Sequence, residues 1–306
     1  MTNWDSDIDA IAVFGSTARR QIDHLSDRDI LFVSDKPAAL RRAASRLETS
    51  GWSCINYSWS RLRKAAAWNS LFMQHLKQEA IILKDHEDIL SSVLSRFSAK
   101  GSYKVEAEEA KHLLSILERI PNSIQGRYWA LDVLMVGLRS LTIATLADEG
   151  IYSFSFKEML TKLQRIGILS HENVIDLYAL RRFKSKYRKR AWSPDLDWAR
   201  VFHLIEIVDK RFSIGLNPVR AKPWQVLTAA VESDDNTNNW YLNSRKLEAA
   251  LWCMPTHSAY ADEGNATRER LFRLVRSPSE YGWVLSSEWG LLKEDLVSLT
   301  SLSQMD

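Results

Sequence analysis

The chain has 306 residues, of which 45% are hydrophobic and 26% are charged. This is ordinary globular composition, and the length predicts two or three domains. The formal net charge of +3 is too small to identify a nucleic-acid-binding protein, although it is compatible with a nucleotide or RNA substrate. Cys54 and Cys253 are the only cysteines, and their wide separation argues against a disulfide framework or a zinc site.

Neither the N-terminal residues nor the longest apolar run indicates a membrane-directed or membrane-spanning segment. The first residues, MTNWDSDIDAIAVFG, carry acids where a signal peptide would carry positive charge. The longest apolar run, 133–147, is interrupted by Arg139 and is too short to span a bilayer. We therefore expect a soluble, cytoplasmic protein with no membrane partner.

The first part of the chain alternates between short apolar runs and amphipathic stretches, which predicts a small α/β unit over residues 1–98. Gly15-Ser16 ends the first run, and Gly51 follows the first long helix. The expected strands cover 8–14, 29–33 and 54–59, with a further apolar run at 80–83. A short helix or a turn is expected at 17–24, and helical segments are expected at 38–49 and 61–83.

Helical periodicity dominates the rest of the chain. It predicts an α-helical bundle domain over 99–217 and a short helical C-terminal extension over 218–306. The fold class expected is therefore α+β, with a small mixed sheet followed by helices. The expected helices cover 106–119, 128–148, 156–166, 172–190, 198–214, 223–231, 244–253 and 266–276.

The stretch AVFGSTARRQIDHLSDRDILFV, residues 12–33, carries the polar residues that best predict a function. Asp27 and Asp29 are two positions apart at the start of a strand, so both side chains project on the same side. Two such carboxylates suit Mg²⁺ bound together with substrate phosphates. Gly15 allows a ligand to approach the backbone, and Ser16 offers its hydroxyl and its N–H to a phosphate oxygen. An N-capping serine and two solvated aspartates are the simpler alternative.

These residues resemble a known signature. FGSTARR…SDRDILFV is similar to the FGS-x-ARG…SD-x-D-hydrophobic pattern of the DNA polymerase β-like nucleotidyltransferase superfamily, in its minimal and kanamycin-nucleotidyltransferase-like branch. The resemblance covers about residues 8–85. It implies that Gly15 and Ser16 contact phosphates and that Asp27 and Asp29 bind two divalent metals, Mg²⁺ or Mn²⁺. It also implies a nucleoside triphosphate substrate, ATP foremost, with Arg19 or Arg20 assisting.

The chain departs from this family at two places. Arg20 stands where the family has glycine, which would reshape the phosphate loop. The family also supplies a third carboxylate from a later strand, whereas the matching SCINYSW contains none and offers only Asn56. Asp85 or Asp132 could serve instead. Otherwise the protein binds nucleotide without efficient turnover, so an inactive nucleotide- or RNA-binding regulator remains the alternative function.

The helical part offers two further candidates. Asp132 and Arg139 are seven residues apart on an apolar helix, where they could cover the nucleotide site with Asp132 as a general base, or could be ion-paired core residues. LRRFKSKYRKR, residues 180–190, could bind RNA through Arg182, Lys186 and Lys189, or could be a solvated helix face whose aromatics pack inward.

The function expected from all of this is metal-dependent transfer of a nucleoside monophosphate to an acceptor hydroxyl, with release of pyrophosphate. The sequence leaves the acceptor open among a protein, an RNA and a small molecule. The helical segment resembles HEPN-like domains in architecture. The Arg-x(4–6)-His pattern of their ribonuclease members is absent after Arg181 and Arg182, so no ribonuclease site is expected.

Overall fold

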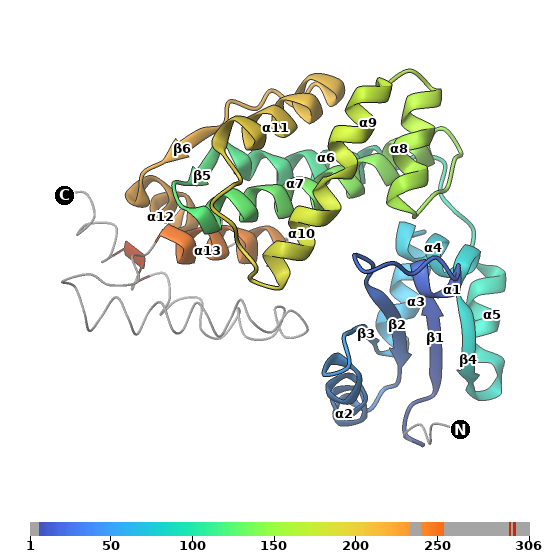
Figure 1. Ribbon diagram of the computed structural model, residues 1–306. Coiled ribbons are helices and arrows are strands. Elements are labelled where there is room, and N and C mark those ends of the chain that lie inside the picture. Colours follow the sequence, from blue (N-terminus) through green and yellow to red (C-terminus); the bar gives the residue numbers. More distant parts are fainter. Residues whose placement is uncertain (1–5, 233–239, 254–293, 295, 298–306) are drawn as a thin grey trace. The chain divides into compact units, whose positions relative to one another are not determined.

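The computed structural model describes residues 6–232, 240–253, 294, 296 and 297 (Figure 1). Contacts divide the chain into two compact units. Unit 1 comprises residues 1–107 and 141–167, and unit 2 comprises residues 108–140 and 168–306. The expected α+β class is confirmed, because a small mixed sheet at the N-terminus is followed by helices. Each unit is made of two separate stretches of the chain, whereas the sequence predicts three consecutive segments.

Unit 1 is built on a four-stranded sheet in the order β3-β2-β1-β4. β1 (Ala10–Phe14) is antiparallel to both of its neighbours, β2 (Arg28–Val33) and β4 (Ile81–Asp85). β3 (Trp52–Tyr57) runs parallel to β2. β1 is buried along its whole length, because it is central and covered on both faces.

Helices cover both faces of this sheet. α2 (Pro37–Glu48) packs on one face, and α3 (Trp59–Ala67), α4 (Leu71–Glu79) and α5 (Ile89–Arg96) pack on the other. Strand side chains alternate between faces. Along β2, Ile30 and Phe32 belong to the α2 side, while Leu31 and Val33 belong to the side of the three helices.

Unit 1 extends past residue 98 because of one buried aromatic. The Tyr103 side chain is fully buried against Ala144 and Ala147 of α7, and its hydroxyl donates a hydrogen bond of 3.1 Å to the backbone oxygen of Asn69. These contacts attach the last turns of α7 (Ile124–Asp148) to the sheet unit. The other short elements of unit 1 are α1 (Gly15–Ala18), a 3₁₀ turn (His86–Asp88) and α8 (Phe156–Arg165).

Unit 2 is helical, with one small parallel pair formed by β5 (Arg119–Pro121) and β6 (Val219–Ala221). That pair was not expected, because a strand of three residues is too short to show an alternating hydrophobic pattern in the sequence. The helices are α6 (Lys104–Ser115) with a 3₁₀ turn (Ile116–Glu118), α7, α9 (His171–Tyr178), α10 (Leu180–Arg188), α11 (Trp198–Phe212), α12 (Pro223–Val231) and α13 (Trp240–Cys253). The helix expected over 266–276 lies outside the described residues.

Two stretches that sequence treats as continuous helices are each divided. The stretch 61–83 breaks at Asn69, whose φ of 53° is left-handed, and Ser70 then caps α4 by accepting a hydrogen bond from the Met73 N–H at 3.3 Å. The stretch 172–190 divides into α9 and α10 at Ala179. At the first of these breaks, a left-handed residue and a serine cap end a helix that hydrophobic periodicity alone would continue.

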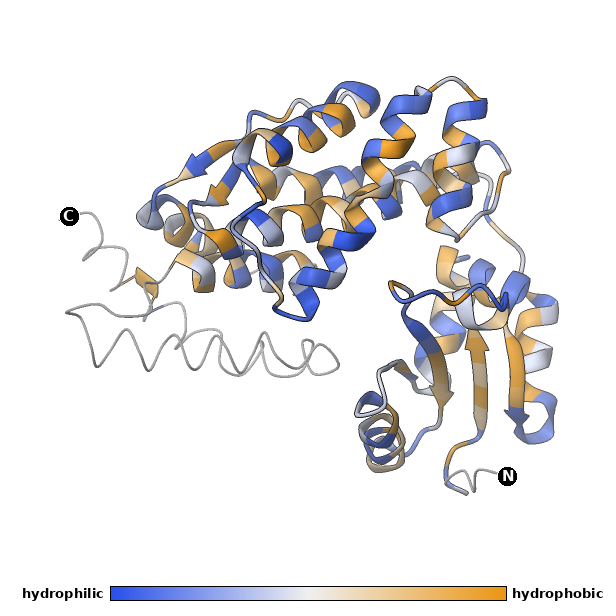
Figure 2. Cartoon of the chain, viewed as in Figure 1, coloured by the Kyte–Doolittle hydropathy of each residue, from blue (hydrophilic) through white to orange (hydrophobic). Residues whose placement is uncertain are grey.

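The central helix, α7, is apolar around its circumference, as Figure 2 shows. It is long and apolar enough to cross a membrane by length and composition, but 78% of its most apolar window is buried in the protein. A helix that is hydrophobic all round belongs in a protein core when other elements cover it. α7 is therefore a core helix of the described structure.

Close packing at the start of α7 generates a stability prediction. A Cβ atom added at Gly126 would overlap the backbone oxygen of Pro121 in β5. Although alanine ordinarily stabilises a helix relative to glycine, we expect Gly126→Ala to lower the free energy of unfolding by about 1–3 kcal/mol through overpacking. Denaturant unfolding measures this. Gly101→Ala, where an added Cβ meets nothing within 4 Å, is the control, and equal effects of the two substitutions would contradict the prediction.

Candidate functional site

The end of β1 and the start of β2 bring a glycine turn against a carboxylate. Phe14, the last residue of β1, pairs with Asp29 of β2, so Gly15 lies directly beside Asp29. Gly15 is buried and has a φ of +65°, and a Cβ built on it would lie 2.9 Å from Oδ2 of Asp29. Only glycine fits there without strain, because the left-handed backbone and the close carboxylate both oppose a side chain.

Ser16 ties the same turn to Asp27. Its hydroxyl donates a hydrogen bond of 2.8 Å to the backbone oxygen of Asp27, one position before β2 begins. Both Asp27 and Asp29 are partly exposed. The structure therefore brings together the four residues that sequence singled out, Gly15, Ser16, Asp27 and Asp29, which we call the turn site.

The two arginines that follow the turn differ in their surroundings. Arg20 is exposed and has a φ of 56°, so this position adopts the left-handed conformation that glycine accommodates best. The Arg19 guanidinium forms an ion pair with Oε2 of Glu79 on α4. Nε2 of His75 lies 3.0 Å from the same oxygen. Glu79 is thus held between two groups, and we call Arg19, Glu79 and His75 the Glu79 cluster.

Aromatic packing fixes the His75 end of this cluster. The buried His75 ring stacks on Phe154 with centroids 4.2 Å apart, and meets Phe14 edge-on at 5.2 Å. Since Phe14 is the strand partner of Asp29, the cluster and the turn site share one corner of the sheet. His75 and Glu79 are four positions apart on α4, but nothing local in the sequence indicates that Arg19, 60 positions away from Glu79, would join them.

Burial and the two partners of Glu79 have opposite effects on its pKa, and the partners have the larger combined effect. Burial by itself would raise the pKa of this carboxyl, but the hydrogen bond from His75 and the charges of His75 and Arg19 together hold it below its usual value. Glu79 is therefore a carboxylate at neutral pH, committed to its two partners.

Neither Asn56 nor Asp85, which sequence offered in place of the family's third carboxylate, lies beside Asp29. Asn56 pairs with Phe32 of β2, three residues and about 10 Å along the sheet from Asp29, and belongs to the opposite face. Asp85 pairs with Ala10, at the far end of β1 from the turn site. It instead caps α5, accepting hydrogen bonds from the N–H groups of Leu90 and Ser91 at 2.9 and 2.8 Å.

Ser53 occupies the position next to Asp29 on β3. The parallel register pairs Asp29 with Ser53 directly, so both side chains lie on the same face. Among residues 6–232 and 240–253, no three His, Cys, Asp or Glu side chains are grouped closely enough to hold a metal ion. The turn site therefore offers two carboxylates and one neighbouring hydroxyl, rather than three acids.

Neither cysteine provides an alternative chemistry. Burial raises the pKa of Cys54 to about 12, with a further contribution from Glu48, and burial likewise raises the pKa of Cys253 to about 12. Both thiols stay protonated at neutral pH, whereas a nucleophilic cysteine needs a lowered pKa.

Asp132 belongs to a buried charge cluster of unit 2. Its carboxylate lies 2.7 Å from Nη2 of Arg245 on α13, and it is 2% exposed. Arg245 also contacts Glu248 at 2.6 Å, and Nε of Arg188 lies 3.8 Å from Asp132. Asp132 is thus a partner in an ion-paired core, and neither the general-base role nor the third-ligand role considered from sequence follows from its surroundings.

The other cations considered from sequence remain on or near the surface of unit 2. Arg139 is half-buried on α7, and Arg182, Lys186 and Lys189 lie on or just after α10, with Arg182 and Lys189 exposed. The aromatics among them turn inward: Tyr187 is 6% exposed, and Phe183 packs on Tyr128 with centroids 6.2 Å apart. A stacking platform for bases is therefore not formed by α10, although its cations remain available to a polyanion.

Comparisons with known proteins add no assignment to this geometry. No protein-family model matches the chain, and no curated protein matches it. The similarity to the polymerase β-like signature stays a resemblance, carried by residues 14–33.

The Glu79 cluster generates a pH prediction. Because the folded protein lowers the pKa of Glu79, ionised Glu79 stabilises the fold above a pH of about 4.3, and this stabilisation is lost as the pH falls through the folded value. Glu79→Gln should lower the free energy of unfolding by about 1–3 kcal/mol at neutral pH.

That deficit should shrink as the pH falls through the lowered pKa of folded Glu79, because wild-type Glu79 is then protonated. Thermal unfolding across pH measures the difference. Glu48→Gln removes an exposed carboxylate elsewhere in unit 1 and serves as the control. A Glu79→Gln deficit that stays constant across the acid range would show that charge is not what the cluster contributes.

Proposed function

We propose that unit 1 binds the Mg²⁺ or Mn²⁺ complex of a nucleoside triphosphate, ATP foremost, and transfers the nucleoside monophosphate to an acceptor hydroxyl. One observation carries the proposal: the left-handed Gly15 turn lies against the Asp29 carboxylate, while Ser16 ties Asp27 to the same turn. The resemblance of residues 14–33 to the polymerase β-like signature supports the same assignment.

The residues of the turn site fit a hard divalent cation. Asp27 and Asp29 supply carboxylate oxygens, which Mg²⁺ and Mn²⁺ prefer, and Mg²⁺ is commonly held by one or two carboxylates plus substrate phosphates. The absence of a side chain at Gly15 leaves room beside Asp29. When bound, the metal offsets the negative charge of the phosphates and of the leaving oxygen.

The proposed reaction is an in-line displacement at the α-phosphorus. The acceptor hydroxyl loses its proton, its oxygen bonds to the α-phosphorus, and the bond to the bridging oxygen breaks so that pyrophosphate leaves. Gly15 lets the phosphates approach the backbone. Arg19, oriented by Glu79, has further N–H donors for a phosphate oxygen. Asp27 and Asp29 act by holding charge in position rather than by covalent chemistry.

The acceptor is proposed as a protein, an RNA or a small molecule. The cations Arg182, Lys186 and Lys189 of unit 2 suit an acidic or nucleic-acid acceptor through charge alone. The cytoplasm, where magnesium and nucleoside triphosphates are abundant, is the proposed compartment, and the free cysteines are compatible with it.

One observation favours a second candidate, a regulator that binds nucleotide without turning it over. The position beside Asp29 on β3 is Ser53, and a neutral hydroxyl neither neutralises a second metal nor helps to ionise an acceptor. Two-metal transfer depends on its ligand count. The transferase and the regulator therefore share the turn site and differ only in whether product forms.

Loss of the two carboxylates tests the turn site itself. Asp27→Asn/Asp29→Asn should abolish magnesium-dependent ATP binding and reduce labelled product by about a hundredfold or more, because both metal ligands are lost. Calorimetry measures binding, and transfer from α-labelled nucleotide to RNA, protein or the chain itself measures product. Asp88→Asn, an exposed acid of unit 1, is the control. Unchanged magnesium-dependent binding in the double variant would refute the site.

Restoring the third acid separates the two candidates. Ser53→Asp places a carboxylate beside Asp29, and we expect it to raise product formation about tenfold or more in magnesium. Ser53→Asn is the isosteric neutral control, and Asn56→Asp adds the same charge on the opposite face. Product from the wild type supports the transferase. Nucleotide binding without product until Ser53 is replaced by aspartate supports the regulator.

A further inference from the structure

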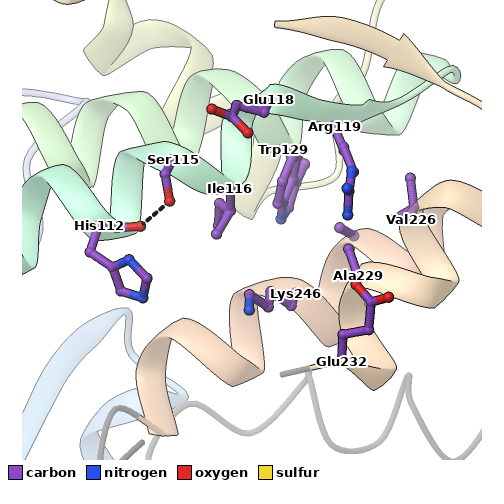
Figure 3. Close-up of a pocket in the computed structure, with 11 residues that line it drawn as sticks. His112, Ser115, Ile116, Glu118, Arg119, Trp129, Val226, Ala229, Glu232 and Lys246 are labelled. Atoms are coloured by element: carbon purple, nitrogen blue, oxygen red, sulfur yellow. Dashed lines mark hydrogen bonds between the residues drawn. The ribbon is translucent and has the colours of Figure 1, made fainter. Parts of the chain in front are cut away.

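Unit 2 contains a pocket that takes no part in the proposed function. It has a volume of about 270 Å³ and lies among α6, β5, α7, α12 and α13 (Figure 3). Its walls come from two separate segments, 112–129 and 226–249, so no local sequence motif indicates the pocket. The lining residues that the argument uses are Ile116, Glu118, Arg119, Trp129, Val226 and Lys246.

One side of the pocket is apolar. Trp129 of α7 is fully buried and donates its indole N–H to the backbone oxygen of Arg245 at 3.2 Å, which fixes the ring in the wall. Ile116 and Val226 flank it, with Ala229 and Ala249 nearby. Such a wall can bury the body of a small organic molecule.

Two cations enter the same pocket. Arg119 projects from β5 into it, and Lys246 reaches it from α13 (Figure 3). Neither side chain forms an ion pair within the described part of the chain, where the acids that line the pocket are Glu118 and Glu232. Burial, and then the charge of Arg119, lower the pKa of Lys246, while Glu232 opposes this only in part.

This arrangement costs stability in the protein alone. A half-buried ammonium is disfavoured by lost solvation, and a neighbouring guanidinium adds repulsion. Elsewhere in unit 2 a buried cation has its partners, since Arg245 contacts both Asp132 and Glu248. The pocket thus places an exposed guanidinium and a half-buried ammonium, neither of them ion-paired among the described residues, beside an apolar wall. This combination suits a ligand that has both an anionic group and an apolar body.

We infer that this pocket binds a small organic phosphate, with the phosphate group between Arg119 and Lys246 and the apolar body against Ile116, Val226 and Trp129. The guanidinium fork and the ammonium together match a phosphate monoester, which carries up to two negative charges. The inference is independent of the proposed nucleotide site, because every lining residue belongs to unit 2.

Calorimetric titration of the full-length protein with phenyl phosphate tests it. Phenyl phosphate should bind in the millimolar range or tighter, and phenol should not bind at the same concentrations, because phenol supplies the body without the charge. Inorganic phosphate should bind more weakly than phenyl phosphate, because it lacks the body. Equal binding of phenyl phosphate and inorganic phosphate would show that the apolar wall contributes nothing, and would overturn the inference.

Substitutions locate the site. Arg119→Gln and Lys246→Met should each weaken phenyl phosphate binding by about tenfold or more, since each removes a charged hydrogen-bond donor. Arg165→Gln and Lys157→Met, exposed cations of α8 outside the pocket, are the matched controls. Binding that survives both pocket substitutions, or that is lost equally in the controls, would overturn the inference.

The melting temperature of Lys246→Met distinguishes loss of a ligand contact from loss of the fold. The lowered pKa of Lys246 means that its charged form opposes folding at neutral pH. Lys246→Met should therefore melt at the same or a higher temperature than the wild type while binding less phenyl phosphate. A lower melting temperature together with weaker binding would indicate a merely structural lysine and would count against the inference.

Discussion

The pairing of Phe14 with Asp29 is the constraint on which the candidate nucleotide site depends. An antiparallel register assigns each residue of β1 one partner on β2, and a slip of one position would turn Asp29 to the opposite face. The register is held because both faces of the sheet are packed against helices, so the apolar residues of β2 have no alternative arrangement. The left-handed turn at Gly15 then follows immediately, and the close approach of the Asp29 carboxylate is its consequence.

Charged side chains of the described residues occur in two kinds of arrangement. In the Glu79 cluster an acid is held between Arg19 and His75, and in the core of unit 2 Arg245 is held between Asp132 and Glu248. Both arrangements satisfy buried charge within the protein, as a low-dielectric interior demands.

The pocket of unit 2 and the turn site each contain two side chains of like charge. Arg119 and Lys246 line the pocket with Glu118 and Glu232 but form no ion pair within the described residues. Asp27 and Asp29 are two positions apart beside one turn. A like-charged pair costs stability in the free protein and is retained where a ligand supplies the opposite charge. This contrast, rather than the presence of charged residues as such, separates structural clusters from candidate binding sites.

The search for a third carboxylate shows that a sequence pattern can predict a strand without predicting its register against the neighbouring strand. SCINYSW reads correctly as a strand, and β3 covers Trp52–Tyr57. Which residue of β3 lies beside Asp29 depends on the register between β2 and β3, two parallel strands connected by α2. That register pairs Asp29 with Ser53 rather than with Asn56. Asp85 was an equally reasonable acid in sequence and was excluded only because β4 places it at the other end of β1.

The sequence by itself determined the α+β class, most strands and helices, and the local meeting of Gly15 and Ser16 with Asp27 and Asp29. These features depend on hydrophobic periodicity, turn residues and a hairpin-like neighbourhood within about twenty positions, all of which act over short distances along the chain. Only the tertiary structure decided that Arg19 contacts Glu79, that Asp132 contacts Arg245, and that the pocket of unit 2 exists. Those contacts join residues 60 or more positions apart, and their partners are selected by packing of the whole core.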